Sequence, residues 1–265
     1  MTSTTPGAPT PVDDHDADLR CVGRWPDLHA ADPTRGHRPA VMDVRGDVSW
    51  EQLARRVARL ATGLGRAGIG SGDVVVTLLS GSRECVELAL ACARVGAVIA
   101  PLGHGRSAPE LGRVMELAGP RLFVTDDELS DLVAEARDGA AVDFPVVRVG
   151  RRGPDGYDAL LADTGDLDGY RARIRSTDPL WMVVAGGPGR RPSARFVSHR
   201  ALEQISPGNP AAGAHPLVLG AIDDDARAFR AIVSQLAVGG TVVLPRAGCA
   251  RRTGAVVPGE RTEVG

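Results

Sequence analysis

The sequence contains no lysine, because all 31 of its basic residues are arginine, against 33 Asp and Glu. A flexible ammonium group, which many phosphate-handling enzymes use, is therefore absent from the chemistry of this chain. Abundant arginine, alanine, glycine and proline without lysine is also typical of a GC-rich genome. The missing lysine thus has a compositional interpretation beside the chemical one, and both stay open.

Cysteine and long apolar runs are also scarce. The chain has four cysteines without C-x-x-C spacing, namely Cys21, Cys85, Cys92 and Cys249. This pattern indicates structural thiols in a reducing compartment. The apolar runs, such as Val74–Leu79, are far shorter than the roughly 20 residues of a membrane span, and the Thr/Pro/Gly-rich start at 1–11 lacks a signal-peptide pattern. We therefore expect a cytoplasmic protein without a membrane span.

Charge and length limit the class of protein further. The formal net charge of −2 supplies no basic field of the kind that attracts nucleic acid or anionic membrane. A chain of 265 residues, 43% of them hydrophobic, can bury the core of one large or two small domains. The composition therefore excludes disorder of the whole chain and predicts that any nucleotide partner is a small one.

Strand and helix patterns alternate along the chain. Ser49 with Gln52 forms a capping box that starts a helix, and the apolar run Val74–Leu79 is typical of a parallel strand buried on both faces. Other strands are expected at 38–43, 97–102, 122–125, 145–149, 180–184, 217–222 and 241–244, with helices at 82–95, from 107, at 129–136, from 199 and at 226–236. The alternation predicts an α/β fold with layered, mainly parallel sheets and flanking helices.

Composition shifts suggest how the chain is divided. Both ends are rich in glycine, proline and polar residues without periodicity, and the stretch between the two α/β series is polar. The predicted segments are a flexible leader at 1–17, a first α/β subdomain at 18–150, a surface connection at 151–176, a second, incomplete α/β subdomain at 177–247 and a flexible tail at 248–265.

The segment 183–202 carries the most informative motif. A buried strand runs into a loop rich in glycine, proline and arginine, and a helix capped by Ser198 follows. Backbone amides of such a loop can point at phosphate oxygens, and arginines can bind them bidentately. The candidate ligand contacts are Gly186, Gly187, Gly189, Arg190, Arg191, Ser193 and Arg195. An ordinary solvated turn is the alternative, because Gly-Pro-Gly is common in turns.

Two further glycine motifs occur. The G-x-G-x-x-G match at 63–68 closes a helix rather than opening one, which predicts a helix C-terminus. The G-x-G-x-x-A match at 103–108 follows a strand and precedes a helix, and Asp126 lies near the distance expected for a ribose contact. Ser107, however, caps the helix after the loop. A Rossmann-type dinucleotide binder is therefore a lesser alternative.

Seven short segments occur in order: R-P-A-V at 38–41, V-S-W-E-Q-L at 48–53, G-I-G-S-G-D-V-V at 68–75, A-C-A-R-V-G-A-V-I-A-P-L at 91–102, T-D-P-L at 177–180, V-S-H-R-A-L at 197–202 and G-G-T-V-V-L at 239–244. Together they resemble the N-terminal part of the AMP-forming acyl-activating enzymes, which include acyl-CoA synthetases, peptide-synthetase adenylation domains and luciferases. The resemblance covers roughly residues 38 to 245. It implies the N-terminal subdomains of that fold, ATP with Mg²⁺ as cofactors and a carboxylic-acid or acyl ligand.

The chain departs from this family at the phosphate loop. The family loop reads T/S-S-G-T-T-G-x-P-K-G, whereas residues 185–194 read A-G-G-P-G-R-R-P-S-A. The hydroxyls are lost, and Ser193 stands at the lysine position. The acidic stretch 223–225 replaces an aromatic residue and a histidine, and the family's later motifs do not appear in the sequence.

Adenylation requires positioned cations, hydroxyls and a metal ion to stabilise the pyrophosphate leaving group. We therefore expect an AMP-dependent synthetase/ligase-like protein that is impaired or inactive on its own. We expect it to act as a binding or scaffold partner, with a protein partner or as a homo-oligomer, and we assign no catalytic residue and no metal ligand. An active split enzyme completed by a second chain is the alternative.

Overall fold

The computed structural model describes residues 21–140, 142–161, 173–186, 190–205, 216–218 and 226–244. The predicted leader and tail, Cys249, the acidic stretch 223–225 and the candidate contacts Gly187 and Gly189 lie outside these residues.

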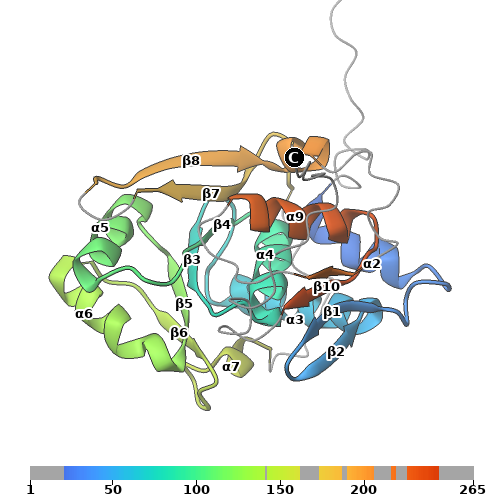
Figure 1. Cartoon of the computed structure of the whole chain (residues 1–265), viewed down its shortest axis with the longest axis horizontal. Coiled ribbons are helices and arrows are strands. Elements are labelled where there is room, and N and C mark those ends of the chain that lie inside the picture. Colours follow the sequence, from blue (N-terminus) through green and yellow to red (C-terminus); the bar gives the residue numbers. More distant parts are fainter. Residues whose placement is uncertain are drawn as a thin grey trace, which may run out of the picture.

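A six-stranded sheet forms the centre of the molecule (Figure 1). All of its neighbouring pairs are parallel except the last one, in which β8 runs antiparallel to β7. The strand order is β6 (Val146–Val149), β5 (Leu122–Asp126), β3 (Val74–Leu78), β4 (Val98–Pro101), β7 (Pro179–Ala185) and β8 (Ser193–Ser198). The strands bury apolar side chains on both faces, as the continuous apolar runs predict.

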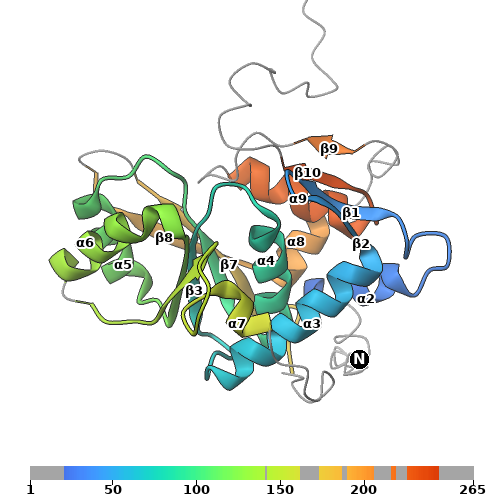
Figure 2. The ribbon, with the colours of Figure 1, turned by 90° about the horizontal axis from the view of Figure 1, so that it is seen from below.

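Helices cover both faces of this sheet, and Figure 2 shows the two layers on opposite sides of it. One face packs against α5 (Ala108–Ala118) and α6 (Ser130–Ala140). The other face packs against α3 (Trp50–Arg66), α4 (Arg83–Val95) and α9 (Ala226–Ala237). The predicted α/β fold with mainly parallel sheets and flanking helices is confirmed.

A second, smaller sheet joins distant parts of the chain. Its order is β2 (Gly46–Ser49), β1 (Pro39–Asp43), β10 (Val242–Leu244) and β9 (Leu217–Val218). The parallel pairing of β1 with β10 places Val41 opposite Val242. Both sheets therefore contain strands from both predicted subdomains, and the division at 151–176 does not separate the sheets. The subdomain boundaries themselves stay a prediction.

Short elements complete the described part of the chain: η1 (Val22–Arg24), α2 (Trp25–Ala30), η2 (Asp127–Leu129), α7 (Tyr157–Leu161) and α8 (His199–Ile205). Helix α7 lies in the predicted surface connection, where no helix was expected. It packs against α3, and its buried Tyr157 donates a hydrogen bond of 2.9 Å to Glu87 on α4.

Helix boundaries follow the capping signals. The Ser49 hydroxyl accepts a hydrogen bond from the Gln52 amide (3.2 Å), and the Ser49 amide donates one to the Gln52 side chain (2.9 Å), which confirms the capping box. Helix α3 ends at Arg66 and is followed by Gly68 with φ of +74°, so the glycine motif at 63–68 does close a helix.

Three cysteines can be placed in the described residues. Cys21, Cys85 and Cys92 are buried and none of them is in a disulfide, which agrees with the predicted structural thiols. Burial raises the pKa of Cys85 to about 12, so this thiol stays protonated and acts as a small apolar side chain. The structure contains no helix, among those it describes, that is long and apolar enough to cross a membrane.

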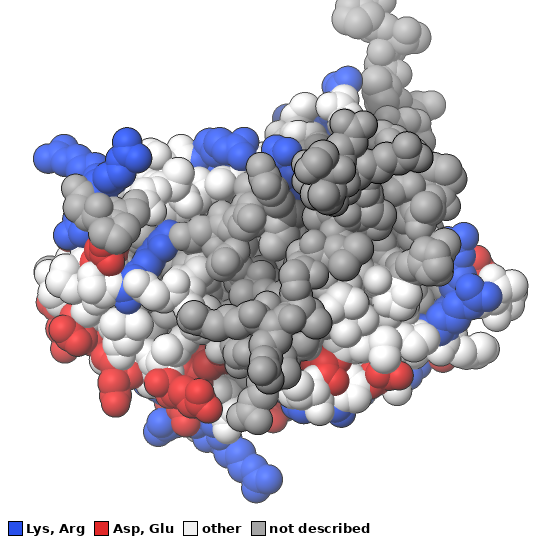
Figure 3. All heavy atoms as spheres, viewed as in Figure 1, with Lys and Arg blue, Asp and Glu red and all other residues white. Residues whose placement is uncertain are grey.

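Charge is unevenly distributed over the surface shown in Figure 3. Arginine atoms gather along the margin where β8 runs, and acidic atoms gather on the side of α6. A net charge of −2 therefore conceals a basic margin on this face of the molecule.

Candidate phosphate-binding site

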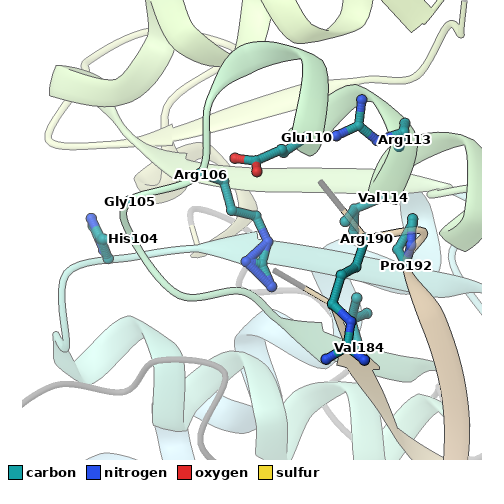
Figure 4. Close-up of a pocket in the computed structure, with 10 residues that line it drawn as sticks. His104, Gly105, Arg106, Glu110, Arg113, Val114, Val184, Arg190 and Pro192 are labelled. Carbon is teal, nitrogen blue, oxygen red and sulfur yellow. The ribbon is translucent and has the colours of Figure 1, made fainter. Parts of the chain in front are cut away.

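The candidate site lies at the carboxyl ends of β4 and β7. These strands are parallel neighbours, with Ile99 opposite Trp181, so the loops that follow them emerge at the same edge of the sheet. The two loops enclose a pocket of about 190 Å³ (Figure 4). Ligands of open α/β sheets bind at this edge, because loops from neighbouring strands converge there.

Three elements line the pocket. The loop after β4 and the first turns of α5 form one wall, and the loop between β7 and β8 forms the other. The lining residues are His104, Gly105, Arg106, Glu110, Arg113, Val114, Val184, Gly186, Arg190 and Pro192. Three of the five ionisable side chains among them are arginines, so the pocket favours an anion.

A capping box fixes the start of α5 beside the pocket. The Ser107 amide donates to Glu110 Oε2 (3.0 Å), and the Ser107 hydroxyl donates to the same oxygen (2.9 Å). These hydrogen bonds, together with the charges of Arg113 and Arg106, lower the pKa of Glu110. The Glu110 carboxylate is therefore ionised at neutral pH and is held at the helix start by Ser107.

Gly186 permits the turn that brings the second wall into place. Its φ is +144°, and a Cβ added to it would lie 3.0 Å from Pro192 Cα. A side chain would therefore be strained by the backbone conformation and would press on the returning strand. Val184 and Val114 give the pocket an apolar part beside its arginines.

Arg106 and Arg190 come from the two opposite loops, and Figure 4 shows their side chains extending in the same direction. Guanidinium groups from two walls can hold different oxygens of one phosphate or pyrophosphate group, because each presents a planar fork of donors. The arrangement can bind and orient such an anion.

Five of the seven predicted contacts lie in the described part of the chain. Gly186 and Arg190 line the pocket, whereas Arg191 is exposed and is not among the lining residues. Ser193 is the first residue of β8 and pairs with Ala185. Arg195 pairs with Val183 and lines a different groove. Gly186 and Arg190 thus line this pocket and Arg195 lines another groove, because β8 begins at Ser193 and carries the later residues away from the loop. The binding role of the seven candidate residues stays a prediction.

Sequence reasoning missed Arg106, Arg113 and His104 as members of this site. The G-x-G-x-x-A motif at 103–108 did mark the loop of His104 and Arg106, but as part of a dinucleotide fingerprint, whereas Arg113 lies on α5. Nothing in the local sequence shows that β4 lies beside β7, since these strands are separated by β5 and β6 along the chain.

Asp126, the ribose contact expected for a dinucleotide binder, forms hydrogen bonds within the protein. Asp126 Oδ2 accepts hydrogen bonds from the Ser80 amide (2.8 Å) and the Ser80 hydroxyl (2.5 Å). The carboxylate therefore ties the end of β5 to the loop after β3.

His199 is a buried histidine at the start of α8. Both of its ring nitrogens are buried without a hydrogen-bond partner among the described residues. Burial lowers the pKa of His199 to about 4, against an opposing effect of Asp178. The ring is therefore neutral at physiological pH.

The described residues contain no group of three His, Cys, Asp or Glu side chains placed to hold a metal ion. The acidic stretch 223–225 lies outside them. Glu110 is the one carboxylate among the residues that line the pocket.

Comparison with known proteins identifies the family. Residues 28–184 match the AMP-binding enzyme family, which is more than half of the chain, so the chain belongs to this family. The fatty acid–[acyl-carrier-protein] ligase ScoC of Streptomyces coeruleorubidus is 27% identical over 192 residues, which are 72% of this chain and 35% of ScoC. The matched family region ends at Val184, before the loop that contains Arg190.

Solved structures share the fold at low sequence identity. The luciferase-like enzyme from the mealworm Zophobas morio is 19% identical with a TM-score of 0.76, over 91% of this chain and 56% of that one. The N-terminal subdomain of Klebsiella oxytoca NpsA, solved in complex with 3-hydroxyanthranilyl-AMSN, is 20% identical with a TM-score of 0.69, over 86% of this chain and 54% of that one. This chain thus spans about a third of ScoC and about half of these two structures.

Proposed function

We propose that this AMP-binding family member binds a phosphate-bearing ligand in the pocket between the two loops and does not form adenylates on its own. The observation that carries the proposal is the placement of Arg106 and Arg190 on opposite walls of the pocket. Their guanidinium groups stand in for the single loop lysine that the family pattern contains and this chain lacks.

The pocket suits the phosphate groups of ATP better than a Mg²⁺ ion. Arg106, Arg113 and Arg190 supply donors for phosphate oxygens, whereas Glu110 supplies the only lining carboxylate and already accepts two hydrogen bonds from Ser107. Adenylation needs strong stabilisation of the charge that develops on the leaving pyrophosphate. The described residues hold no group placed to bind a metal ion, and the loop at 185–192 has no hydroxyl side chain. These arginines therefore support binding and orientation of the anion rather than its displacement.

A relative supports ligand binding by such a subdomain. The Klebsiella oxytoca NpsA structure is of an N-terminal subdomain in complex with 3-hydroxyanthranilyl-AMSN. The present chain covers 54% of that subdomain. By analogy, we propose that the present chain retains a carboxylic-acid or acyl-adenylate ligand without completing the reaction that makes it.

A split enzyme is the second candidate function. The chain spans 35% of ScoC and 56% of the luciferase-like structure. In the split arrangement, a second polypeptide supplies the parts of such an enzyme that this chain does not match. In this case adenylation would appear only when a second polypeptide is added.

Two measurements test the proposal. Calorimetry with ATP and with pyrophosphate should show binding that weakens at least tenfold in the variants Arg106→Ala and Arg190→Ala. The matched control is Arg59→Ala, because Arg59 is an exposed arginine on α3 that does not line the pocket. Unchanged affinity in both pocket variants would exclude this pocket.

Pyrophosphate exchange with a panel of carboxylic acids tests the catalytic part. We expect no exchange by the isolated chain. Exchange without any added protein would overturn the proposal that the chain does not form adenylates on its own. Exchange that requires a second polypeptide would favour the split enzyme.

A further inference from the structure

The outer edge of β8 is an exposed sheet edge. Strand β8 ends the six-stranded sheet, and no strand in the described part of the chain pairs with its outer side. Residues 193–196 are all exposed, and only Val197 in this strand is buried. An edge strand of this kind presents unpaired backbone donors and acceptors that another extended chain can use.

The two faces of β8 differ in chemistry. Arg195 lies opposite Val183, which packs in the core with α4 and α9, so Arg195 stands on the α9 face of the sheet. Phe196 lies opposite Met182, which packs in the core with α5, and is 58% exposed on that face. Side chains opposite each other in an antiparallel pair share a face. The strand therefore presents a cation on one face and an apolar ring on the other.

A second arginine extends the basic face. Arg195 and Arg230 of α9 line a groove of about 340 Å³, and the Arg230 Nε atom is buried without a hydrogen-bond partner among the described residues. Arg191 and Arg200 are exposed near the two ends of β8. None of these four arginines forms an ion pair with an acidic side chain of the described residues. Figure 3 shows arginine atoms along this margin.

We propose that the outer edge of β8 docks an extended segment of an acidic partner protein as a seventh strand. The docked segment alternates, with acidic side chains on the α9 face toward Arg195 and Arg230 and apolar side chains on the α5 face toward Phe196. Backbone hydrogen bonds supply affinity and the alternating side chains supply specificity, as in other cases of strand addition. A second copy paired through its own β8 is disfavoured, because Arg195 side chains on neighbouring strands would repel each other.

Binding of a synthetic peptide tests this proposal. The probe is a fluorescein-labelled, end-capped decapeptide in which Glu and Val alternate, and its affinity is followed by fluorescence anisotropy. Arg195→Glu should weaken binding at least tenfold, and Phe196→Ser about threefold. Arg59→Glu, which makes the same charge change on α3, should leave the affinity unchanged. A decapeptide of alternating Lys and Val should bind Arg195→Glu better than the original protein.

Two further probes separate strand addition from simple charge attraction. The same peptide with N-methyl groups on alternate residues cannot form one row of backbone hydrogen bonds and should lose at least tenfold in affinity. A peptide of the same composition with its Glu residues grouped at one end should also bind more weakly. Equal binding of all three peptides would overturn the proposal in favour of a non-specific anion surface.

A second copy of the chain or a polyanion at the β8 edge would give results that differ from those expected for an acidic partner protein. A particle mass of two chains that returns to one chain in Arg195→Glu would identify a second copy as the occupant and overturn the proposal. If heparin bound as tightly as the peptide, and if Arg195→Glu weakened heparin binding and peptide binding equally, the proposal would also be overturned. If Arg195→Glu fails to fold by circular dichroism, Arg195→Gln replaces it. The variant Arg106→Ala should keep full peptide binding, so the fate of the phosphate pocket does not decide this result.

Discussion

At the scale of single residues, His199 is a buried ring that contributes no hydrogen bond to the described structure. A neutral imidazole without partners loses its contacts with water on folding and gains only packing. Protonation would place an unpaired charge in the core, which is why burial lowers the pKa of His199 to about 4.

This lowered pKa predicts how stability depends on pH. The unfolded chain protonates His199 near pH 6.5, whereas the folded chain does so only near pH 4. Between these values the unfolded state binds more protons, so the stability falls as the pH falls from 6.5 to 4, by on the order of 3 kcal/mol. The variant His199→Leu should lose this part of the pH dependence and match or exceed the stability of the original chain at pH 5.

Urea unfolding at pH 7, 6, 5 and 4.5 measures the effect. The control is His104→Asn, which replaces an exposed histidine. A parallel pH dependence in His199→Leu and the original chain would show that the buried ring is not the titrating group.

Prediction from the sequence works unevenly at this scale. Local chemistry predicted Gly186 and Arg190 as candidate contacts, because a turn and a guanidinium are visible in any window of the sequence, and both residues line the pocket. The contribution of Arg106 depends on which strand neighbours β7, and no local pattern contains that information.

At the scale of elements, two glycines that both lie inside helices differ in how much space surrounds them. A Cβ on Gly63 in α3 would lie 2.1 Å from the Leu160 carbonyl oxygen of α7, whereas a Cβ on Gly139 in α6 meets nothing within 4 Å. Gly63 is therefore required by the close approach of two helices, and Gly139 is not.

We expect alanine to change stability in opposite directions at these positions. Gly139→Ala should stabilise the fold by about 0.5 to 1 kcal/mol, because alanine loses less backbone entropy in a helix. Gly63→Ala should destabilise the fold by about 1 to 3 kcal/mol, since α7 must move to accept the methyl group. Urea unfolding of both variants measures the difference, and each serves as the control for the other. A stabilising Gly63→Ala would mean that α7 moves freely.

Strong local signals predicted most of the helices and parallel strands. Capping at Ser49 and Ser107 and the apolar run from Val74 are properties of a few adjacent residues. Strand β8 was missed because its residues 193–196 are exposed and carry no apolar alternation. Helix α7 was missed because it has five residues, too few for a helical period to appear.

At the scale of the whole molecule, the pairing of sheets could not be predicted. Strand β1 pairs with β10 about 200 residues later, and both strands have ordinary apolar patterns that fit many partners. The structure adds a charged contact where the smaller sheet meets α4. Asp43 of β1 accepts hydrogen bonds from Arg83 on α4 and from Arg45, which in turn binds Glu84 of α4 (2.6 and 2.7 Å).

This contact predicts how acid weakens the packing of the smaller sheet against α4. Burial alone would raise the pKa of Asp43, but the hydrogen bonds from Arg83 and Arg45 outweigh it and hold the pKa well below the usual range. The lowered pKa means that the stabilisation is complete above the unfolded value near 3.8 and is lost as the pH falls toward the folded value. Asp43→Asn should therefore cost about 3 kcal/mol at pH 7, where it leaves Arg83 without its charged partner.

The difference in unfolding free energy between the original chain and Asp43→Asn, measured in urea, should be constant from pH 7 to 5 and shrink below pH 4. The matched control is Asp47→Asn, because Asp47 is an exposed aspartate on β2 and should change stability by less than about 0.5 kcal/mol at any pH. If the Asp43→Asn difference stayed the same at pH 3, the contact would stabilise the sheets through packing and neutral hydrogen bonds. If it shrank, the ionised carboxylate would be what links the smaller sheet to α4.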